Sequence, residues 1–354
     1  MKSIRDATIA GLRVLMRCDF NVPLDKEGGV TDDFRIRSTL PTIEYILGKK
    51  GKLVLMTHLG DPDGKPTKAL SVERIRKKLA ELLDTPVASA QDCVGKTIEE
   101  STRRMKPGDV LLLENVRFHK EEEENNKEFA QKLAALGDMY VNDAFSVCHR
   151  PHASVVGVPL LLPAYAGFFL ELELQGLERL LLNPAHPVVA VIGGKKIESK
   201  LPVIDRISKT ADAVLLGNIL ANEAKSKKVK FKNSSKIFMP LDGIPGQGKE
   251  FDIGPKTKAL YVKILKNAKT VFWAGPLGKY EDARYEEGSL AVAKAIIKSN
   301  AYSIAGGGNL LAFLGKHRLR EKFSHVSTGG SAMLEFLSGK KLPGLEALNY
   351  YAGN

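Results

Sequence analysis

Short aliphatic runs alternate with longer amphipathic segments along the whole chain. The short runs are rich in Val, Ile and Leu, as in parallel strands that are buried on both faces. In the longer segments apolar residues recur at i, i+3 and i+4, which is the spacing of an amphipathic helix. In the first half, expected strands lie at 13–20, 52–58, 109–115 and 138–145, and expected helices at 35–50, 71–83 and 127–137. In the second half, expected strands lie at 187–194, 212–218, 236–242, 270–275, 302–308 and 325–330.

Strands that alternate with helices form right-handed crossovers and parallel sheets covered on both faces. The 354 residues exceed the roughly 150 residues of a typical domain, so two domains are expected. The expected fold class is α/β, with two doubly wound parallel-sheet (Rossmann-like) domains joined by a hinge helix. The expected boundaries are 1–165 for the N-terminal domain, 166–186 for the interdomain helix, 187–340 for the C-terminal domain, and 341–354 for a C-terminal segment that could return to the first domain.

Several segments between these elements have more than one interpretation. The helical pattern at 166–187 ends at Asn183-Pro184 and could be a hinge or a plain connector; the pattern leaves both open. The Lys-rich stretch at 221–236 could bind nucleic acid, but with one aromatic residue we expect a solvated loop. The acidic run at 120–128 is expected to begin a solvated helix. The stretch at 243–250 fits GxxxxGK, but it lacks the following Ser/Thr and helix of a phosphate-binding loop.

Charge and cysteine content narrow the class of protein. The net charge of +12 suits an acidic ligand, nucleic acid or an anionic membrane surface, and does not choose among them. Three isolated cysteines, Cys18, Cys93 and Cys148, argue against a disulfide framework and favour a reducing compartment. The most hydrophobic run, 155–170, contains two prolines and is too short to span a bilayer. We therefore expect a cytoplasmic protein that binds neither membrane nor nucleic acid.

The expected strands of the first half are followed by cationic and polar side chains. Ligands of open parallel sheets bind beyond the carboxyl ends of strands, so these side chains are expected to share one crevice. They are Asp19, Asn21, Arg35, His58, Arg117, His149, Arg150 and His152. Guanidinium groups bind phosphate and carboxylate in a bidentate manner, which predicts a site for a small anion. His149 and His152 lack a third ligand motif, so we do not expect a metal there.

The expected strands of the second half end mostly in glycine, as in “IGGKK”, “LLGN”, “WAGPLG”, “AGGGN” and “STGGS”. Glycine allows backbone N–H groups to approach a ligand closely, and the N-terminus of a following helix favours phosphate. Lys195, Lys196 and Lys200 add positive charge beside the first of these turns. The second half is therefore expected to bind the phosphates of a nucleotide. Together, the two predicted sites indicate a two-domain kinase, because phosphoryl transfer needs mainly alignment and charge neutralisation.

Motifs along nearly the whole chain, in the expected order, resemble the phosphoglycerate kinase family. They include “RCDFNVPLD”, “THLGDPDGKP”, “LLLENVRFHKEEE”, “YVNDAFSVCHRPHAS”, “VIGGKKIESKL”, “WAGPLGKYE”, “AGGGN” and “SHVSTGGSAMLEFLSGKKLPGLEAL”. The resemblance implies reversible phosphoryl transfer between 1,3-bisphosphoglycerate and ADP, giving 3-phosphoglycerate and ATP in glycolysis. It also implies a monomer that requires Mg²⁺ with the nucleotide.

The resemblance also implies roles for individual residues. The phosphoglycerate would be bound by Asp19, Asn21, Arg35, His58, Arg117 and Arg150. The nucleotide would be bound by Gly194, Lys196, Lys200, Gly217, Glu281, Gly306, Gly307, Gly308 and Asn309. Transfer itself would be assisted by Arg35, Lys200, Gly307 and Gly330. Asn309 would contact the metal weakly through the nucleotide, because an amide oxygen carries no formal charge.

The chain departs from the family pattern at five positions. Asp61 stands where the family usually has arginine, and Asn309 stands where it has aspartate. The others are Asn218, Ala274 and Leu310. These departures keep an alternative open, a non-catalytic relative that binds phosphoglycerate or nucleotide at a degenerate metal and adenine site. Arg35 and Lys200, which a binding protein would need less, favour the enzyme.

Overall fold

A computed structural model of the chain describes residues 1–246 and 250–353. The chain forms two compact units: the first holds Met1–Leu172 together with the residues from Lys341 onward, and the second holds Glu173–Lys340. The boundary falls inside helix α6 (Phe168–Leu182). The GxxxxGK-like stretch includes residues 247–249, which lie outside the described residues.

The first unit is built on a six-stranded parallel sheet with the order β3-β4-β2-β1-β5-β6. Its strands are β1 (Arg13–Arg17), β2 (Lys52–Met56), β3 (Val87–Ser89), β4 (Val110–Leu112), β5 (Met139–Asn142) and β6 (Ala164–Ala166). Its helices are α1 (Phe34–Gly48), α2 (Glu73–Leu83), α3 (Lys96–Arg104), α4 (Lys120–Glu123), α5 (Lys127–Ala134) and α13 (Pro343–Ala347). Since the chain builds β2 on one side of β1 and β5 on the other, the topology switches at β1, where ligands of such sheets bind.

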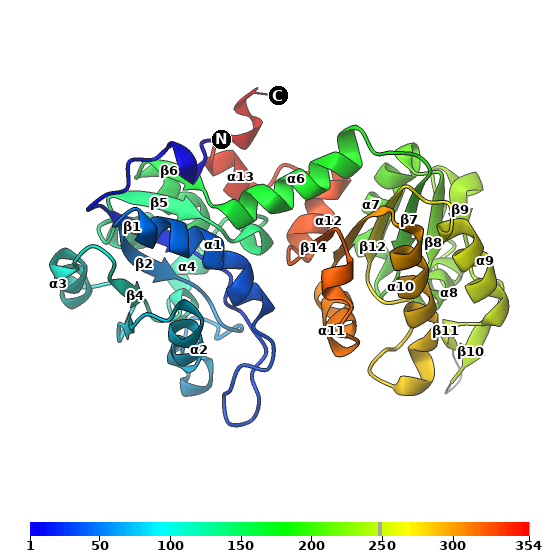
Figure 1. The fold of residues 1–354 in the computed structure, drawn as a ribbon, viewed down its shortest axis with the longest axis horizontal. Helices are drawn as coiled ribbons and strands as arrows, with labels where there is room; N and C mark the ends of the chain where they lie inside the picture. The colour runs from blue at the N-terminus through cyan, green and yellow to red at the C-terminus, as the bar shows by residue number, and fades with distance from the viewer. Residues whose placement is uncertain (247–249, 354) are drawn as a thin grey trace. The chain divides into compact units, whose positions relative to one another are not determined.

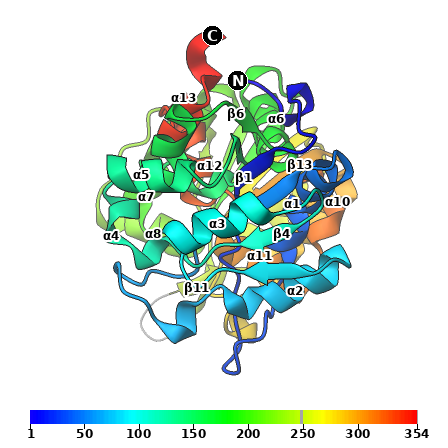
Figure 2. The ribbon, with the colours of Figure 1, turned by 90° about the vertical axis from the view of Figure 1, so that its left-hand side faces the viewer.

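Side chains of β1 alternate between the two faces of this sheet. Val14 and Met16 pack in one buried cluster with Ile43 of α1 and Ile75 of α2. Arg17 lies on the opposite face, where its guanidinium meets residues that follow α5 in the chain. Figure 2 shows α1 and α2 on one side of the strands and α3 and α5 on the other. Helices therefore cover both faces, as expected for a parallel sheet.

The second unit repeats this design with a parallel sheet of order β14-β13-β12-β7-β8-β9 and a separate antiparallel pair, β10-β11. The strands are β7 (Val188–Ile192), β8 (Ala213–Leu216), β9 (Ile237–Phe238), β10 (Gly243–Pro245), β11 (Glu250–Ile253), β12 (Thr270–Ala274), β13 (Tyr302–Gly306) and β14 (His325–Ser327). The helices are α7 (Ile197–Thr210), α8 (Asn218–Ser226), α9 (Pro255–Leu265), α10 (Glu287–Ser299), α11 (Gly308–Lys316) and α12 (Ser331–Ser338). The chain starts in the middle at β7 and later returns beside it with β12, so this pair marks the switch point.

The core of the second unit is centred on Trp273 of β12, which is fully buried. Tyr261 of α9, Val292 of α10 and Phe313 of α11 belong to the same cluster, so these helices cover one face of the sheet. Figure 1 shows α9 and α10 side by side, in agreement with their extensive contacts. The indole Nε1 donates to the Gly275 carbonyl oxygen over 2.9 Å, which satisfies the one polar atom of this buried ring.

The predicted fold class is confirmed, since both units are α/β folds with six-stranded parallel sheets. Most predicted strands end earlier in the structure than the aliphatic runs, because the last residues of each run curve into the loops beyond the sheet. The strands β3, β6, β10 and β11 were not predicted. They are short and, apart from Val87, Ala166, Asp252 and Ile253, their residues are partly or fully exposed, so they lack a buried-strand pattern.

The acidic run at 120–128 forms two short helices rather than one. Helix α4 ends at Glu123, and Asn125 follows with a φ of 49°, which a continuing helix does not allow. Asn126 then caps α5, its side-chain oxygen accepting a hydrogen bond from the Phe129 N–H over 3.0 Å.

The carboxyl group of Asp143 lies at the start of α6, where it accepts a hydrogen bond from the Leu170 N–H over 2.9 Å. Asp143 is fully buried, and this burial raises its pKa to about 7. The chain after Lys341 packs in the same unit, where the Gly344 N–H donates to the Cys148 carbonyl oxygen over 2.9 Å. Among the described residues, no helix has the length and hydropathy needed to cross a bilayer.

Candidate substrate and nucleotide sites

The sequence-predicted anion residues of the first unit follow β1, β2, β4 and β5, four strands that lie next to one another around the switch point. Asp19 pairs with Arg35 of α1 and accepts a hydrogen bond from the Ser146 hydroxyl. Its other oxygen accepts from the Asn21 N–H over 3.1 Å. Burial alone would raise the pKa of Asp19, but Arg35, His58 and these hydrogen bonds outweigh it and lower the pKa. The Asp19 carboxylate is therefore ionised and holds Arg35 in place.

The loop after β2 joins this network through Asn21. The Asn21 side-chain oxygen accepts a hydrogen bond from the Gly60 N–H over 3.0 Å, and the Gly60 carbonyl oxygen accepts one from Arg117 over 3.0 Å. Arg117 also pairs with Asp61, and its Nε lies 3.4 Å from a carboxylate oxygen of Glu123. The Asp61 side chain is 83% exposed, whereas that of Arg117 is 7% exposed. The solvated carboxylate of Asp61 thus pairs with the guanidinium group of Arg117, which was predicted to bind substrate.

The imidazoles of His58 and His152 are neutral near pH 7. Burial lowers the pKa of His58 well below its usual value, and the adjacent Arg17 guanidinium, 3.3 Å from His58 Nδ1, lowers it further. Burial and the nearby Arg117 lower the pKa of His152 to about 3. The positive charge of the cluster therefore comes from arginines, and His58 can only act as a neutral hydrogen-bonding group.

Arg17 was not predicted to take part in the site. It is fully buried, and its Nε donates to the Ser154 hydroxyl oxygen over 2.9 Å. Ser154 in turn donates through both its N–H and its hydroxyl to the buried carboxylate of Glu122. This network fixes the Arg17 guanidinium, which in turn contacts Nδ1 of the His58 ring. An arginine within an otherwise aliphatic buried strand was the sequence signal that could have identified it.

Arg150 differs from the other predicted anion ligands because it is exposed. Its N–H donates to the Val147 carbonyl oxygen over 2.9 Å, which closes the turn after β5. Its charge is close enough to lower the pKa of His152. The structure thus joins Asp19, Asn21, Arg35 and Arg117 by contacts, directly or through Gly60. His58 contacts Arg17 and is close enough to lower the pKa of Asp19, and the Arg150 side chain lies at the surface.

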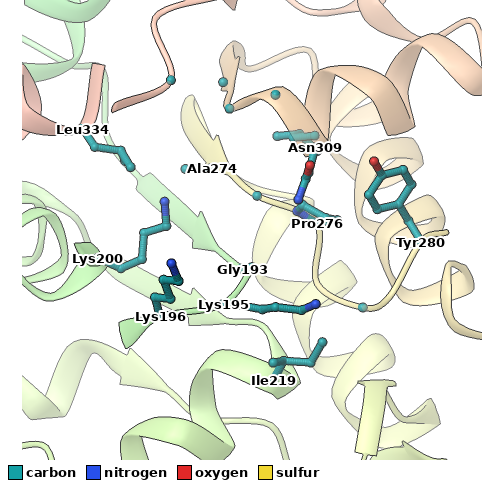
Figure 3. A pocket seen from close by; sticks show the side chains of 18 of the residues that line it. Gly193, Lys195, Lys196, Lys200, Ile219, Ala274, Pro276, Tyr280, Asn309 and Leu334 are labelled. Atoms are coloured by element: carbon teal, nitrogen blue, oxygen red, sulfur yellow. The ribbon is translucent and has the colours of Figure 1, made fainter. Parts of the chain in front are cut away.

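The second unit contains a cavity of about 370 Å³ at the carboxyl ends of β7, β12 and β13. Figure 3 shows Lys195 and Lys196 on the loop after β7 and Asn309 across the cavity from them. The predicted nucleotide residues that line it are Gly194, Lys196, Lys200, Glu281, Gly306, Gly307, Gly308 and Asn309, together with Gly330. Gly217 caps the N-terminus of α8, and Ile219 of that helix lines the cavity in its place.

Helices α7, α11 and α12 begin at this cavity, and α8 contributes Ile219 from its first turn. The first N–H groups of α11 and α12 are not used within the helices and can donate to phosphate oxygens, whereas the first N–H of α7, that of Ile197, donates to the Glu223 carboxylate over 2.8 Å. Gly307 and Gly330 precede α11 and α12 with φ values of 101° and 50°, so both adopt backbone conformations that favour glycine. The loop before α12 is held by the buried carboxylate of Glu173, which accepts a hydrogen bond from the Thr328 N–H over 2.7 Å.

The lysines of the loop after β7 differ in burial. Lys195 and Lys196 are exposed, whereas Lys200 is partly buried and burial lowers its pKa. In Figure 3 the ammonium groups of Lys196 and Lys200 point into the same part of the cavity, and Lys195 extends toward Pro276 and Ile219. The cavity is also lined by residues that were not predicted, among them Pro276, Lys279, Tyr280, Ser331, Met333 and Leu334. Pro276, Lys279 and Tyr280 belong to the loop after β12, and Ser331, Met333 and Leu334 belong to the first turn of α12; neither segment carries a nucleotide-binding signature apart from glycine.

Three departures from the family pattern have local structural explanations. Asn218 is buried, and its amide donates to Glu250 and to the Asp252 carbonyl oxygen, each over 3.0 Å. It therefore fixes the β10-β11 pair to the start of α8. Leu310 is fully buried in the hydrophobic core of the unit, and Ala274 is the buried last residue of β12. These positions contribute packing at the edge of the cavity.

The first of these two doubly wound units thus carries an arginine cluster, and the second carries a glycine-lined cavity with four lysines. The family model described as phosphoglycerate kinase matches residues 4–235 and 221–340. The chain therefore belongs to the phosphoglycerate kinase family, whose members are phosphotransferases with a carboxyl group as acceptor.

Individual relatives and solved structures agree with this membership. The chain is 39% identical over 388 residues to a phosphoglycerate kinase of Pelotomaculum thermopropionicum, covering 98% of each chain. It is 41% identical over 393 residues to one of Chlorobium phaeovibrioides, covering 98% of this chain and 99% of the relative. Its structure resembles those of the enzymes from Pyrococcus horikoshii (TM-score 0.88, 30% identity, 100% of each chain) and Coxiella burnetii (TM-score 0.82, 33% identity, 99% of each chain).

These alignments are longer than the 354 residues of this chain, so the relatives hold residues that it lacks. The two segments of the family match overlap at 221–235, which coincides with nearly all of the Lys-rich stretch. The prediction of a solvated loop is wrong for the start of that stretch, because residues 221–226 form the end of α8 with Ala221 and Ala224 buried.

Proposed function

We propose that this chain catalyses reversible phosphoryl transfer between 1,3-bisphosphoglycerate and ADP, giving 3-phosphoglycerate and ATP. The observation that supports it most is membership of the phosphoglycerate kinase family over nearly the whole chain, with the arginine cluster and the cationic cavity each assembled in its own unit. Glycolysis is the pathway that contains this reaction. A cytoplasmic location and a monomeric state remain predictions from the sequence.

The phosphoglycerate would bind at the arginine cluster. Arg35, Arg117 and Arg150 would bind its carboxylate and phosphate oxygens, because guanidinium donates two parallel hydrogen bonds to such groups. Asp19, ionised by its neighbours, would keep Arg35 oriented. Asn21 and the neutral His58 would contribute hydrogen bonds to hydroxyl and carboxyl oxygens.

The nucleotide would bind in the cavity of the second unit. Backbone N–H groups at the starts of α7, α11 and α12 and the ammonium groups of Lys196 and Lys200 would bind its phosphates. Glu281 would accept hydrogen bonds from the ribose hydroxyls. Ile219 and Tyr280 line the same cavity and offer apolar surface for the base.

In the transfer step, a carboxylate oxygen of 3-phosphoglycerate attacks the γ-phosphorus of ATP. The bond from that phosphorus to the β-γ bridging oxygen breaks, and its electron pair remains on the β-phosphate of ADP. Arg35 and Lys200 would neutralise charge on the transferring group, and the N–H groups after Gly307 and Gly330 would stabilise its equatorial oxygens. The reverse direction uses the same contacts.

The donor set of the cavity fits a protein-held metal poorly. Mg²⁺ prefers an octahedral shell of oxygen atoms and is usually held through one or two carboxylates in addition to substrate phosphates. Among the described residues that line the cavity, Glu281 is the only carboxylate, and Asn309 offers an uncharged amide oxygen. The prediction that Asn309 contacts Mg²⁺ through the nucleotide therefore rests on a weak ligand, and the roles proposed for Arg35, Lys200 and the backbone N–H groups do not depend on it.

The alternative, a binding protein without activity, has no specific observation in its favour. An assay of the purified protein with 3-phosphoglycerate, ATP and Mg²⁺, coupled to consumption of the acyl phosphate, separates the two. We expect turnover in the wild type, a loss of at least about 100-fold in Arg35→Ala, and near-normal turnover in Arg37→Ala. Arg37 is a matched control because it lies on the same helix and pairs with Asp33 instead. Binding of both substrates without turnover would favour the alternative.

A further inference from the structure

Three potential metal ligands gather in the first unit and share no residue with the arginine cluster. Asp92 and Cys93 follow β3 and His119 follows β4, and these two strands are neighbours in the sheet. Each residue offers one ligand atom, and the carboxylate oxygen, the thiol sulfur and the imidazole nitrogen all lie within 4.8 Å of one another. The fold therefore brings three different kinds of metal ligand together from two separate segments of the chain.

Contacts within the protein hold these side chains in place. His119 Nε2 lies 2.7 Å from Asp92 Oδ1, and the same oxygen accepts a hydrogen bond from the Cys93 N–H over 2.6 Å. The His119 ring packs against Phe129, with the ring centres 5.1 Å apart. Cys93 is fully buried, whereas the side chains of Asp92 and His119 are 49% and 27% exposed. A cation can therefore approach from solvent past Asp92 and His119, with the thiol at the buried end.

A cavity of about 310 Å³ adjoins the cluster and is lined by Asp92, Glu114 and His119. Glu114 accepts hydrogen bonds from the Ser71 hydroxyl over 2.6 Å and from the N–H of the next residue over 2.9 Å, so it is held beside the cluster as a further negative charge. Among the described residues that line this cavity, the exposed Lys68 carries the only ammonium group. Two carboxylates against one ammonium group favour a cation, and the space can hold water.

The mixture of ligands selects the kind of cation. Mg²⁺ and Ca²⁺ prefer shells of oxygen atoms, so a thiol in the set makes them poor candidates. Zn²⁺ binds thiolate, imidazole and carboxylate, and a water completes its shell when the protein supplies three ligands. Tetrahedral bonds of about 2.0–2.3 Å separate the ligand atoms by roughly 3–4 Å, which this cluster can reach if the contact between His119 and Asp92 lengthens slightly.

We propose that Asp92, Cys93 and His119 bind one Zn²⁺ ion per chain, with water from the adjoining cavity as the fourth ligand. Burial and the adjacent Asp92 raise the pKa of Cys93, so the metal-free protein holds a thiol. When the ion binds, a bond from sulfur to zinc replaces the S–H bond, and the proton leaves to solvent. The ion joins the loop after β3 to the start of α4 and so stabilises the first unit. The inference does not depend on the proposed function.

Titration of the whole protein, freed of metal with EDTA and then of the chelator, tests the site. Co²⁺ is the first probe, because its bond to a thiolate gives a charge-transfer absorption in the near ultraviolet. We expect one equivalent of Co²⁺ to produce this absorption and Zn²⁺ to displace it. Cys93→Ala should abolish the absorption. Asp92→Asn and His119→Ala should each weaken Zn²⁺ binding, measured by calorimetry, by at least roughly tenfold.

Two matched controls should keep the Zn²⁺ affinity of the wild type. His186→Ala changes a histidine whose Nδ1 lies 2.7 Å from Asp212, a similar pair that belongs to no group of three ligands within the described chain. Cys148→Ala changes a buried cysteine of the same unit outside the cluster.

Thermal melting shows whether each variant is folded. Cys93 is buried, so the substitutions at the partly exposed Asp92 and His119 keep the test decisive even if Cys93→Ala does not fold. Zn²⁺ should raise the melting temperature of the wild type and not that of His119→Ala. The inference is overturned if Co²⁺ gives no thiolate absorption, or if Zn²⁺ binds equally well to the wild type and to the Asp92 and His119 variants. His119 and Asp92 would then form only an ion pair, and the proposed function would be unaffected.

Discussion

Substituting Asp61 by asparagine tests whether the first unit carries an internal competitor for its substrate. Asp61 pairs with the buried guanidinium of Arg117, so an incoming phosphoglycerate must displace a carboxylate before it can use that group. Asp61→Asn removes the charge and keeps the shape of the side chain. We expect 3-phosphoglycerate to bind more tightly because Arg117 becomes available and because one negative charge no longer faces a multiply charged anion.

The size of the effect follows from the exposure of the two partners. The Asp61 side chain is 83% exposed, so its ion pair is screened by water and is worth only about 0.2–1 kcal/mol. Repulsion of the several charges of the ligand adds a comparable amount in this high-dielectric setting. The sum of about 0.4–2 kcal/mol corresponds to roughly 2- to 30-fold tighter binding at low salt, and less at high salt.

The assay is isothermal titration of each variant with 3-phosphoglycerate at two ionic strengths. Asp63→Asn is the matched control, because it removes the same charge from the same exposed loop at a residue that forms no ion pair with Arg117 in the described structure. If Asp61→Asn binds 3-phosphoglycerate no more tightly than the wild type, Asp61 does not compete with the substrate for Arg117. An equal gain in both variants would show that general charge, and not release of Arg117, is responsible.

Two further predictions concern catalysis and stability. Lys200→Ala should lower kcat by about 100- to 1,000-fold in the coupled assay. The control variant Lys209→Ala, which changes an exposed lysine later on α7, should keep a kcat near that of the wild type. A normal kcat in Lys200→Ala would exclude the role proposed for Lys200. The pKa of Asp143 is about 7 in the folded state against 3.8 in the unfolded chain, so between these pH values the folded state binds a proton that the unfolded chain does not. The free energy of unfolding therefore falls as the pH rises from about 4 to about 7, by on the order of 4 kcal/mol at most. Urea denaturation at about pH 4 and about pH 8 should show a larger loss for the wild type than for Asp143→Asn, and equal losses would contradict the buried, protonated state.

The regular parts of the fold were open to prediction because their signals are local. Alternation of aliphatic runs with amphipathic segments reports which faces are buried, and in a parallel sheet both faces of a strand are. The same pattern did not predict β3 and β6, since an edge strand of three residues with mostly exposed or partly exposed side chains has no such signal. The acidic run at 120–128 was also misjudged, because the turn at Asn125 depends on its left-handed backbone.

The candidate sites divide in a similar way. Residues just beyond strand ends, such as Asp19 and Lys200, could be proposed because parallel strands bring their carboxyl ends together. Arg17 was missed: its place in a buried strand marks it as unusual, but its role depends on contacts with residues far away in the chain. The neutral state of His58 was equally hidden, because a pKa depends on burial and on neighbouring charges that come from several strands.

By itself, the sequence determined the class of fold, the order of its elements and the kinds of side chain that follow each strand, because each of these properties depends on a few residues that are neighbours in the chain. Only the tertiary structure decided which charges are balanced. It set Asp61 against Arg117 and gathered four lysines around a cavity whose described lining holds one carboxylate, that of Glu281, although acidic residues are abundant along the chain. Coulomb interactions depend on distance in space and on local water, and neither quantity can be read from the spacing of residues along the chain.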